Sequence, residues 1–252
     1  MEPFLKVTDL SKSFSRAGKN EFFAVDHVSF AVMPGEILGI VGESGSGKST
    51  IAKLITRQID PTAGQIELAG QDITKLKGRS LIPVYAKIQM VFQSPTGSFD
   101  PRRTLGDGIC ESLRNKGVPK TEREEKARRL LEQCGLSGDF LERYPHQVSG
   151  GQCQRAAIAR ALMCDPQVLI FDEATSALDV TVQKQIIDLL QQLQEEKKLT
   201  YLFICHNLAL VQQFCDKVIV LYDGKIVESG LPDEVIMHPQ SKYAKRLVDA
   251  IF

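Results

Sequence analysis

The sequence lacks a surplus of either charge and any long apolar stretch. Its 31 Lys and Arg residues equal its 31 Asp and Glu residues, so the formal net charge is zero. This balance excludes the basic excess typical of proteins that bind nucleic acid, and we expect no DNA or RNA partner. No apolar run approaches the roughly 20 residues that a membrane-spanning helix needs. Residues Met1–Asp9 also lack the basic start and apolar stretch of a signal peptide, so the chain is expected to fold in the cytosol.

The six cysteines show no spacing typical of a metal site or a disulfide framework. They lie far apart in the chain, and no two of them form a C-x-x-C pair. We interpret them as reduced thiols that fill the core. They are Cys110, Cys134, Cys153, Cys164, Cys205 and Cys215.

Short β-branched apolar runs alternate with amphipathic stretches along the chain. This alternation predicts an α/β fold, in which helices flank a parallel sheet. Strands are expected at Ile37–Val41, Ile88–Phe92, Val168–Phe171, Tyr201–Ile204 and Val218–Tyr222. Asp223-Gly224 follows the last of them and predicts a tight hairpin, because glycine tolerates the positive φ of such a turn.

Two further regions differ from this alternating pattern. Three strand-like segments without a long helix between them predict a small antiparallel β lobe; they are Phe4–Asp9, Val28–Met33 and Gln65–Leu68. Between Gln93 and Arg160 the composition becomes helical, which predicts an inserted helical lobe. Thr121-x-x-Glu124 is interpreted as the capping box of one helix there, and Val182 to Leu193 as a later amphipathic helix.

A glycine-rich segment follows the strand Ile37–Val41 directly. The run Gly42-Glu-Ser-Gly-Ser-Gly47-Lys48-Ser49-Thr50 matches G-x-x-x-x-G-K-[ST] and precedes a helical pattern that begins near Ile51. This context is typical of a P-loop, whose backbone N–H groups and lysine bind nucleotide phosphates while its Ser or Thr hydroxyl binds Mg²⁺. The residues expected to bind phosphate are Gly42, Ser44, Gly45, Gly47, Lys48, Ser49 and Thr50, with Ser49 also expected to bind Mg²⁺.

Two carboxylates, Asp172 and Glu173, end the apolar run that begins at Val168. Carboxylates at the end of a buried strand are costly unless they face a cation or water. Asp172 is suited to hold Mg²⁺, and Glu173 is suited to orient the attacking water and accept its proton. A strand that ends in a solvated loop gives the same pattern, so this assignment depends on the P-loop.

The segment Val148-Ser149-Gly150-Gly151-Gln152-Cys153-Gln154-Arg155 resembles the signature motif of ABC ATPases. A helix that starts near Gln152 would add a second anion site from backbone N–H groups and the Ser149 hydroxyl. The resemblance implies that two such domains pair head to tail, so that each ATP lies between one P-loop and the partner's signature motif. The residues implied to contact this ATP are Ser149, Gly150, Gly151 and Gln152.

Other segments match ABC family positions in chain order. The resemblance implies that Gln93 senses Mg²⁺, that Asp179 in Ser176-Ala-Leu-Asp179 lies in a loop crossing the dimer interface, and that His206 contacts the γ-phosphate. The resemblance also implies that an aromatic residue ahead of the first core strand stacks on adenine; Phe14 resembles the family position, and Phe22 and Phe23 are rivals. The catalytic set is therefore expected to be Glu173, His206, Gln93 and Lys48.

The resemblance covers the whole chain and implies a P-loop NTPase with a RecA-like core. The β lobe is expected mainly at 1–36 and 62–75, the core at 37–61, 84–93 and 162–230, the helical lobe at about 94–161, and a short tail at 231–252. The motifs depart from the usual family residues at Val148, Ala174, Cys205 and Asn207. None of these departures removes a phosphate-contacting group, so we expect hydrolysis to survive.

Three segments point to a subfamily: Phe92–Thr104, Leu178–Gln183 and His238–Tyr243 resemble importers of dipeptides, oligopeptides, nickel and metal-carrying opines. The resemblance implies two permeases, a second identical or related ATPase, an extracytoplasmic solute-binding protein and a peripheral location at the cytoplasmic face of a bacterial membrane. The end of the chain at Phe252 favours a nickel- or metallophore-type member over the longer peptide-importer ATPases. An exporter ATPase is the alternative, followed by a soluble ABC protein acting on ribosomes or DNA, whose second ATPase domain and basic linker are missing here.

Overall fold

The computed structural model describes residues 2–15, 21–94, 96–176 and 178–249. The chain forms two compact units, of which the first comprises Met1–Tyr85 and Lys198–Phe252 and the second comprises Ala86–Lys197. No helix in the described ranges combines the length and apolarity that crossing a membrane requires.

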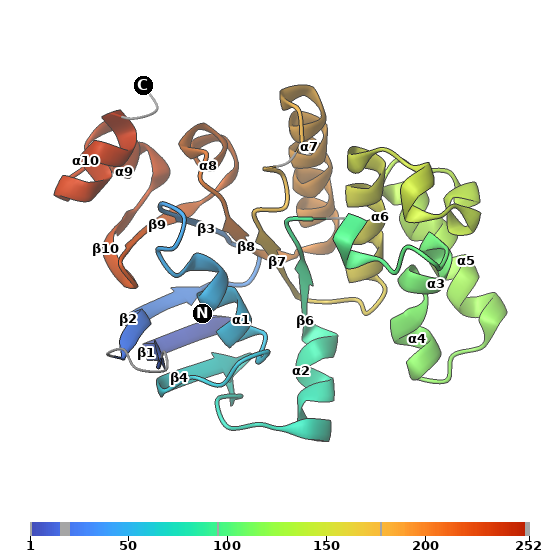
Figure 1. Ribbon diagram of the computed structural model, residues 1–252, viewed down its shortest axis with the longest axis horizontal. Coiled ribbons are helices and arrows are strands. Elements are labelled where there is room, and N and C mark those ends of the chain that lie inside the picture. Colours follow the sequence, from blue (N-terminus) through green and yellow to red (C-terminus); the bar gives the residue numbers. More distant parts are fainter. Residues whose placement is uncertain (1, 16–20, 95, 177, 250–252) are drawn as a thin grey trace. The chain divides into compact units, whose positions relative to one another are not determined.

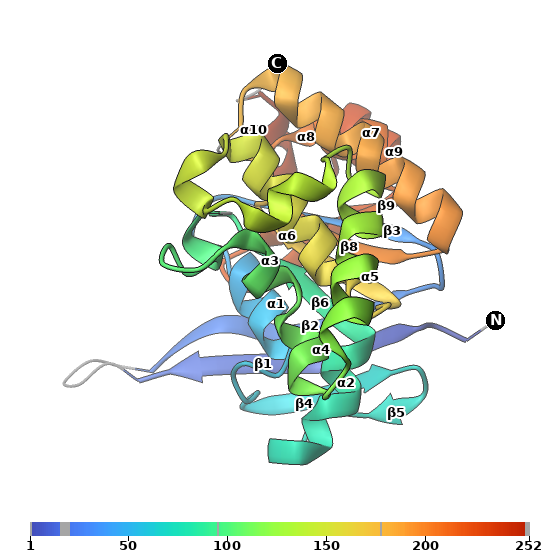
Figure 2. The ribbon, with the colours of Figure 1, turned by 90° about the vertical axis from the view of Figure 1, so that its right-hand side faces the viewer.

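The first unit contains an antiparallel sheet with the strand order β2-β1-β4-β5. Its strands are β1 (Leu5–Phe14), β2 (Phe22–Val32), β4 (Ala63–Leu68) and β5 (Gln71–Asp72). The predicted β lobe is therefore confirmed, although β1 and β2 are longer than expected (Figure 2). Both strands are bulged where Asp9 and His27 adopt positive φ angles of 52° and 53°, and the His27 ring nitrogen lies 2.6 Å from the Asp9 carboxylate.

A second group of strands in the first unit has the order β10-β9-β3-β8. They are β3 (Ile37–Val41), β8 (Thr200–Ile204), β9 (Lys217–Tyr222) and β10 (Lys225–Gly230). β3 is buried along its whole length and runs parallel to β8 and β9. β9 and β10 pair antiparallel across Asp223 and Gly224, whose φ angles of 47° and 77° confirm the predicted hairpin turn.

In chain order, the helices of the first unit come after its strands β3, β8 and β10 (Figure 1). They are α1 (Lys48–Ile55), α8 (Leu208–Phe214), α9 (Pro232–Met237) and α10 (Lys242–Asp249), while α2 (Ile82–Lys87), preceded by the 3₁₀ turn Gly78–Leu81, spans the boundary between the units. α1 begins three residues earlier than the sequence indicates, directly at the end of the glycine-rich segment.

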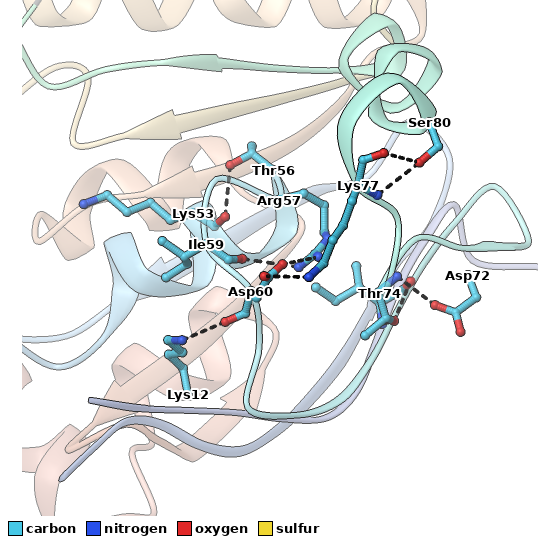
Figure 3. Close-up of polar contacts among 11 residues, drawn as sticks. Lys12, Lys53, Thr56, Arg57, Ile59, Asp60, Asp72, Thr74, Lys77 and Ser80 are labelled. Atoms are coloured by element: carbon cyan, nitrogen blue, oxygen red, sulfur yellow. Dashed lines mark hydrogen bonds and ion pairs between the residues drawn. The ribbon is translucent and has the colours of Figure 1, made fainter. Parts of the chain in front are cut away.

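The chain leaves α1 through Arg57, which adopts a left-handed φ of 55° where glycine is usual. Its buried guanidinium donates to the Asp60 carboxylate at 2.6 Å. Lys12 donates to the Asp60 carbonyl at 2.8 Å, and Lys77 lies 3.7 Å from the Asp60 carboxylate (Figure 3). Asp60 thus links the end of α1 to β1 and to the segment before α2.

The second unit combines two parallel strands with a group of helices. The strands are β6 (Ile88–Val91) and β7 (Val168–Asp172). The helices are α3 (Leu105–Ile109), α4 (Glu111–Asn115), α5 (Lys120–Gln133), α6 (Gly150–Leu162) and α7 (Val180–Lys197), and 3₁₀ turns lie at Thr96–Ser98, Gly138–Glu142 and Pro145–Gln147. α6 is the centre of this group, because it contacts β6, α3, α5 and α7.

The capping box predicted at Thr121 and Glu124 is wrong. α5 begins at Lys120, two residues earlier than this capping box implies, and its N-cap is Pro119 without a side-chain hydrogen bond. Proline fixes its φ near the value found here, −54°, and so sets the direction in which the chain enters the helix. Thr121 consequently lies inside the first turn and has no capping role.

Candidate functional site

The glycine-rich loop fills the space between the end of β3 and the start of α1, within the first unit. Gly42 and Gly47 adopt φ angles of 154° and 108°. A Cβ atom at Gly42 would lie 2.2 Å from the Leu221 carbonyl oxygen, and one at Gly47 would lie 2.2 Å from the Ala24 carbonyl oxygen. Both positions therefore exclude any other residue, on steric as well as conformational grounds.

Lys48, the first residue of α1, is 4 % exposed. Its ammonium group donates to the carbonyl oxygens of Gly42 at 2.7 Å and Glu43 at 2.8 Å, so the side chain folds back along the loop. The nearby Ser46 hydroxyl is buried and has no hydrogen-bond partner among the described residues. A buried lysine and an unpaired hydroxyl in one glycine loop fit a bound phosphate. Ser46 occupies a variable motif position, so the motif by itself does not single it out.

The acidic strand end lies in the second unit. Asp172 is the last residue of β7, and Glu173 follows it with a φ of 50°, a strained conformation for a residue with a side chain. The Ser176 hydroxyl donates to the Glu173 carbonyl oxygen at 2.9 Å, and the Gln93 amide donates to the Glu173 carboxylate at 3.1 Å. The structure therefore brings together two of the predicted catalytic residues, Gln93 and Glu173.

The signature segment forms the start of α6, two residues earlier than expected. The Ser149 hydroxyl accepts a hydrogen bond from the Gln152 N–H at 3.2 Å, and the Gln152 side chain accepts one from the Ser149 N–H at 3.0 Å. This reciprocal pair is a capping box. Gly150 is exposed, whereas a Cβ at Gly151 would lie 2.5 Å from the Val182 side chain. Gly151 is thus required for the packing of α6 on α7, and Gly150 is not.

Two further predicted residues lie next to helix starts. Asp179 accepts a hydrogen bond from the Val182 N–H at 2.9 Å and so caps the first turn of α7. His206 is exposed and lies two residues beyond the end of β8, and Asn207 caps α8 by accepting from the N–H groups of Ala209 and Leu210. Asn and Asp are equally good N-caps, which explains why Asn is tolerated at this position.

The three candidate adenine-stacking residues all lie near the bulged end of the antiparallel sheet. Phe14 pairs in register with Phe22, and their rings stack with centroids 5.9 Å apart. Phe14, Phe22 and Phe23 are 37 %, 43 % and 44 % exposed. Each offers an accessible ring, so the choice of Phe14 stays a prediction.

The predicted residues are divided between the two units. The glycine loop, the three phenylalanines and His206 lie in the first unit; Gln93, the two carboxylates, the signature segment and Asp179 lie in the second. Pro95 and Ala177, which belong to two of the family segments, lie outside the described residues.

The cysteines are core residues, as predicted, with Cys164 half-buried and the other five buried. Burial raises the pKa of Cys134 to about 12 and that of Cys153 to about 11. Both thiols are therefore protonated and unreactive at neutral pH.

Comparison with known proteins connects these features to one family. A profile described as ABC transporter matches residues 25–176. The oligopeptide transport ATP-binding protein OppF of Streptococcus mutans is 45% identical over 249 residues, which cover 98% of this chain and 81% of that protein. OppF of Salmonella typhimurium is 42% identical over 258 residues, covering 98% of this chain and 77% of that protein.

Solved structures show the same fold. The dimeric ATP-binding cassette MJ0796 in a post-hydrolysis state bound to ADP and Pi has a TM-score of 0.82 at 30% identity, over 90% of this chain and 98% of that one. CbiO1 of Clostridium perfringens, part of the ABC transporter complex cbiONQ, has a TM-score of 0.84 at 27% identity, over 99% and 96% of the two chains. These likenesses confirm the predicted α/β P-loop fold. The chain belongs to the ABC transporter family, as one of its ATP-binding and ATP-hydrolysing subunits.

Proposed function

We propose that this ATPase powers the import of peptides through partner permeases, and that its hydrolytic site is built from the residues named above. The observation that carries the hydrolytic part of the proposal is the glycine loop, whose backbone at Gly42 and Gly47 only glycine can adopt and which encloses Lys48. Lys48 binds the nucleotide phosphates, and the exposed rings at Phe14, Phe22 and Phe23 offer stacking surfaces for adenine.

Ser49, Gln93 and Asp172 are proposed to hold Mg²⁺. All three offer oxygen donors, the ligands that this hard cation takes, and water and phosphate oxygens complete its coordination. The bound cation would neutralise phosphate charge. Glu173 accepts a proton from the attacking water, and its hydrogen bond from Gln93 orients the carboxylate for this step. His206 is proposed to contact the γ-phosphate.

Two copies, or this chain and a related one, are proposed to pair head to tail around two ATP molecules. Ser149, Gly150, Gly151 and Gln152 would then face the nucleotide of the partner, and Asp179 would lie at the interface. Support comes from the exposed start of α6 at Gly150 and from the similarity to MJ0796, a bacterial ABC transporter cassette whose solved structure is dimeric. We also propose that the helical lobe that carries the signature segment comprises about residues 94–161.

Peptides are the proposed cargo because several relatives carry peptide or oligopeptide transport in their names. These names favour peptides over a nickel or metallophore cargo. The proposed assembly contains two permeases, a second ATPase and an extracytoplasmic solute-binding protein, with this chain at the cytoplasmic face of the membrane. No nucleic-acid partner is proposed, because the net charge is zero.

The experiment is purification of the tagged full-length chain from its native membranes, followed by uptake of labelled oligopeptides into cells. We expect two permeases, a second ATPase and a solute-binding protein to copurify, and uptake to stop in a strain that carries Glu173→Gln. Recovery of ribosomes or DNA-repair proteins would overturn the transport assignment, and efflux instead of uptake would favour the exporter alternative.

A further inference from the structure

The C-terminal helix α10 touches the glycine loop. The Glu43 backbone N–H donates a hydrogen bond to the Tyr243 hydroxyl at 2.9 Å, across 200 positions of sequence. Tyr243 is 4 % exposed and belongs to His238–Tyr243, a segment whose role in the site the sequence does not explain. Both residues lie in the first unit, so the contact forms within one compact part of the chain.

Several interactions fix the position of Tyr243. The Glu228 carboxylate on β10 accepts hydrogen bonds from the N–H groups of Gln240 at 2.8 Å and Ser241 at 2.7 Å, immediately before α10. The Ser241 hydroxyl then accepts from the Ala244 N–H at 3.0 Å, which caps the first turn of the helix. The Tyr243 ring packs on Tyr222 at the end of β9, with centroids 4.2 Å apart. The hydroxyl is therefore held at the loop by both the helix start and the aromatic pair.

Glu43 connects this contact to the phosphate-binding lysine. Its carbonyl oxygen accepts hydrogen bonds from the Lys48 ammonium at 2.8 Å and from the Ser46 N–H at 3.2 Å. One residue is thus anchored through its N–H by Tyr243 and holds two loop residues through its carbonyl group. A shift of Glu43 would move the lysine that binds phosphate.

We propose that Tyr243 is a positioning residue of the nucleotide site, which holds the Glu43 peptide through its hydroxyl and so makes phosphate binding depend on α10. Burial raises the pKa of the Tyr243 phenol further above physiological pH, so the group is present as a neutral hydroxyl. The inference rests on the nucleotide-binding function of the loop and adds to it a residue from the far end of the chain.

The test compares Tyr243→Phe with Tyr222→Phe in the full chain. Both variants remove one hydroxyl from the same aromatic pair, and Tyr243→Phe removes the hydroxyl that accepts the hydrogen bond from Glu43. Because one hydrogen bond is lost, we expect the Kd for Mg-ADP to rise about fivefold in Tyr243→Phe, which corresponds to about 1 kcal/mol. Amide hydrogen exchange at Glu43, followed by NMR, should accelerate in this variant alone, and KM for ATP should rise while kcat stays within about twofold.

A merely structural role predicts a different result. Tyr243→Phe would then lower the melting temperature of the nucleotide-free chain but leave the Kd for Mg-ADP and the Glu43 exchange rate as in Tyr222→Phe, and this result would overturn the inference. Failure of the wild-type chain to bind Mg-ADP would instead refute the nucleotide-binding function itself.

Glu228→Ala provides a second test, because it releases the start of α10 without touching the loop. We expect it to weaken Mg-ADP binding, and we expect Glu228→Ala combined with Tyr243→Phe to lose less affinity than the sum of the two single losses. Losses that add fully in the double variant would show that the two residues act independently and would contradict the proposed connection.

Discussion

Substitution of Gly150, the first residue of α6, can show whether glycine is needed there for folding or for function. The nearest atom to a Cβ at this position is a Leu178 side-chain carbon at 3.7 Å, which is ordinary van der Waals contact. Gly150 is exposed and does not have a positive φ, so Gly150→Ala should fit the folded chain. Reduced freedom of the unfolded chain should stabilise the variant by about 0.4–1 kcal/mol, a rise in Tm of roughly 1–4 °C for a chain of this size.

The same substitution should impair ATP hydrolysis, because the added methyl group faces the proposed nucleotide of the partner. We expect at least about a tenfold loss of turnover, which corresponds to roughly 1.4 kcal/mol. Gly151→Ala is the matched control: its Cβ would lie 2.5 Å from Val182, and overpacking should cost about 1–3 kcal/mol of stability. Thermal unfolding and ATPase assays check both variants. Full ATPase activity in a stabilised Gly150→Ala chain would refute the placement of Gly150 at the nucleotide.

Three further predictions concern single side chains. Ser149→Ala should lose about 1 kcal/mol of unfolding free energy with its helix cap, whereas Ser149→Asp should keep the cap and the stability but lose ATP-dependent dimerisation through charge repulsion, as light scattering would show. Arg160 packs over the Phe99 ring and donates to the Ser98 carbonyl oxygen, so Arg160→Met should cost about 1–3 kcal/mol in urea unfolding. Burial acts to raise the pKa of Glu228, but hydrogen bonds from backbone N–H groups outweigh it and lower the pKa below its ordinary 4.5. The ionised Glu228 carboxylate therefore contributes fully to the free energy of unfolding above its ordinary pKa, and this contribution is lost as the pH falls through the lowered pKa of the folded chain. The difference in unfolding free energy between wild type and Glu228→Gln should shrink on acidification.

The core strands could be predicted because buried β-branched runs have few alternatives. Ile37–Val41 is β3 to the residue, and the hairpin at Asp223-Gly224 follows from the φ angles that a tight turn requires. The extension of β1 past Asp9 was not predictable. It depends on a bulge whose partner, His27, lies on the neighbouring strand. The predicted capping box at Thr121 is wrong because Pro119, with its fixed φ, is the N-cap of the helix.

The chemistry of the site follows from its residue types in the same way. A glycine loop with Lys48 predicts phosphate binding, and the structure adds the steric reason why Gly42 and Gly47 have no substitute. Local motifs say nothing about contacts between distant segments. The Tyr243 hydroxyl lies 200 positions from Glu43, and no spacing rule connects them.

The central claim, that Lys48 binds the phosphates and Glu173 activates the water, is tested most directly by measuring ATP affinity and turnover together in three chains. The wild type should bind and hydrolyse ATP, Lys48→Ala should lose productive binding, and Glu173→Gln should bind ATP, nearly stop hydrolysis and accumulate as a dimer. Normal affinity and turnover in Lys48→Ala, or unimpaired turnover in Glu173→Gln, would contradict this account of the site.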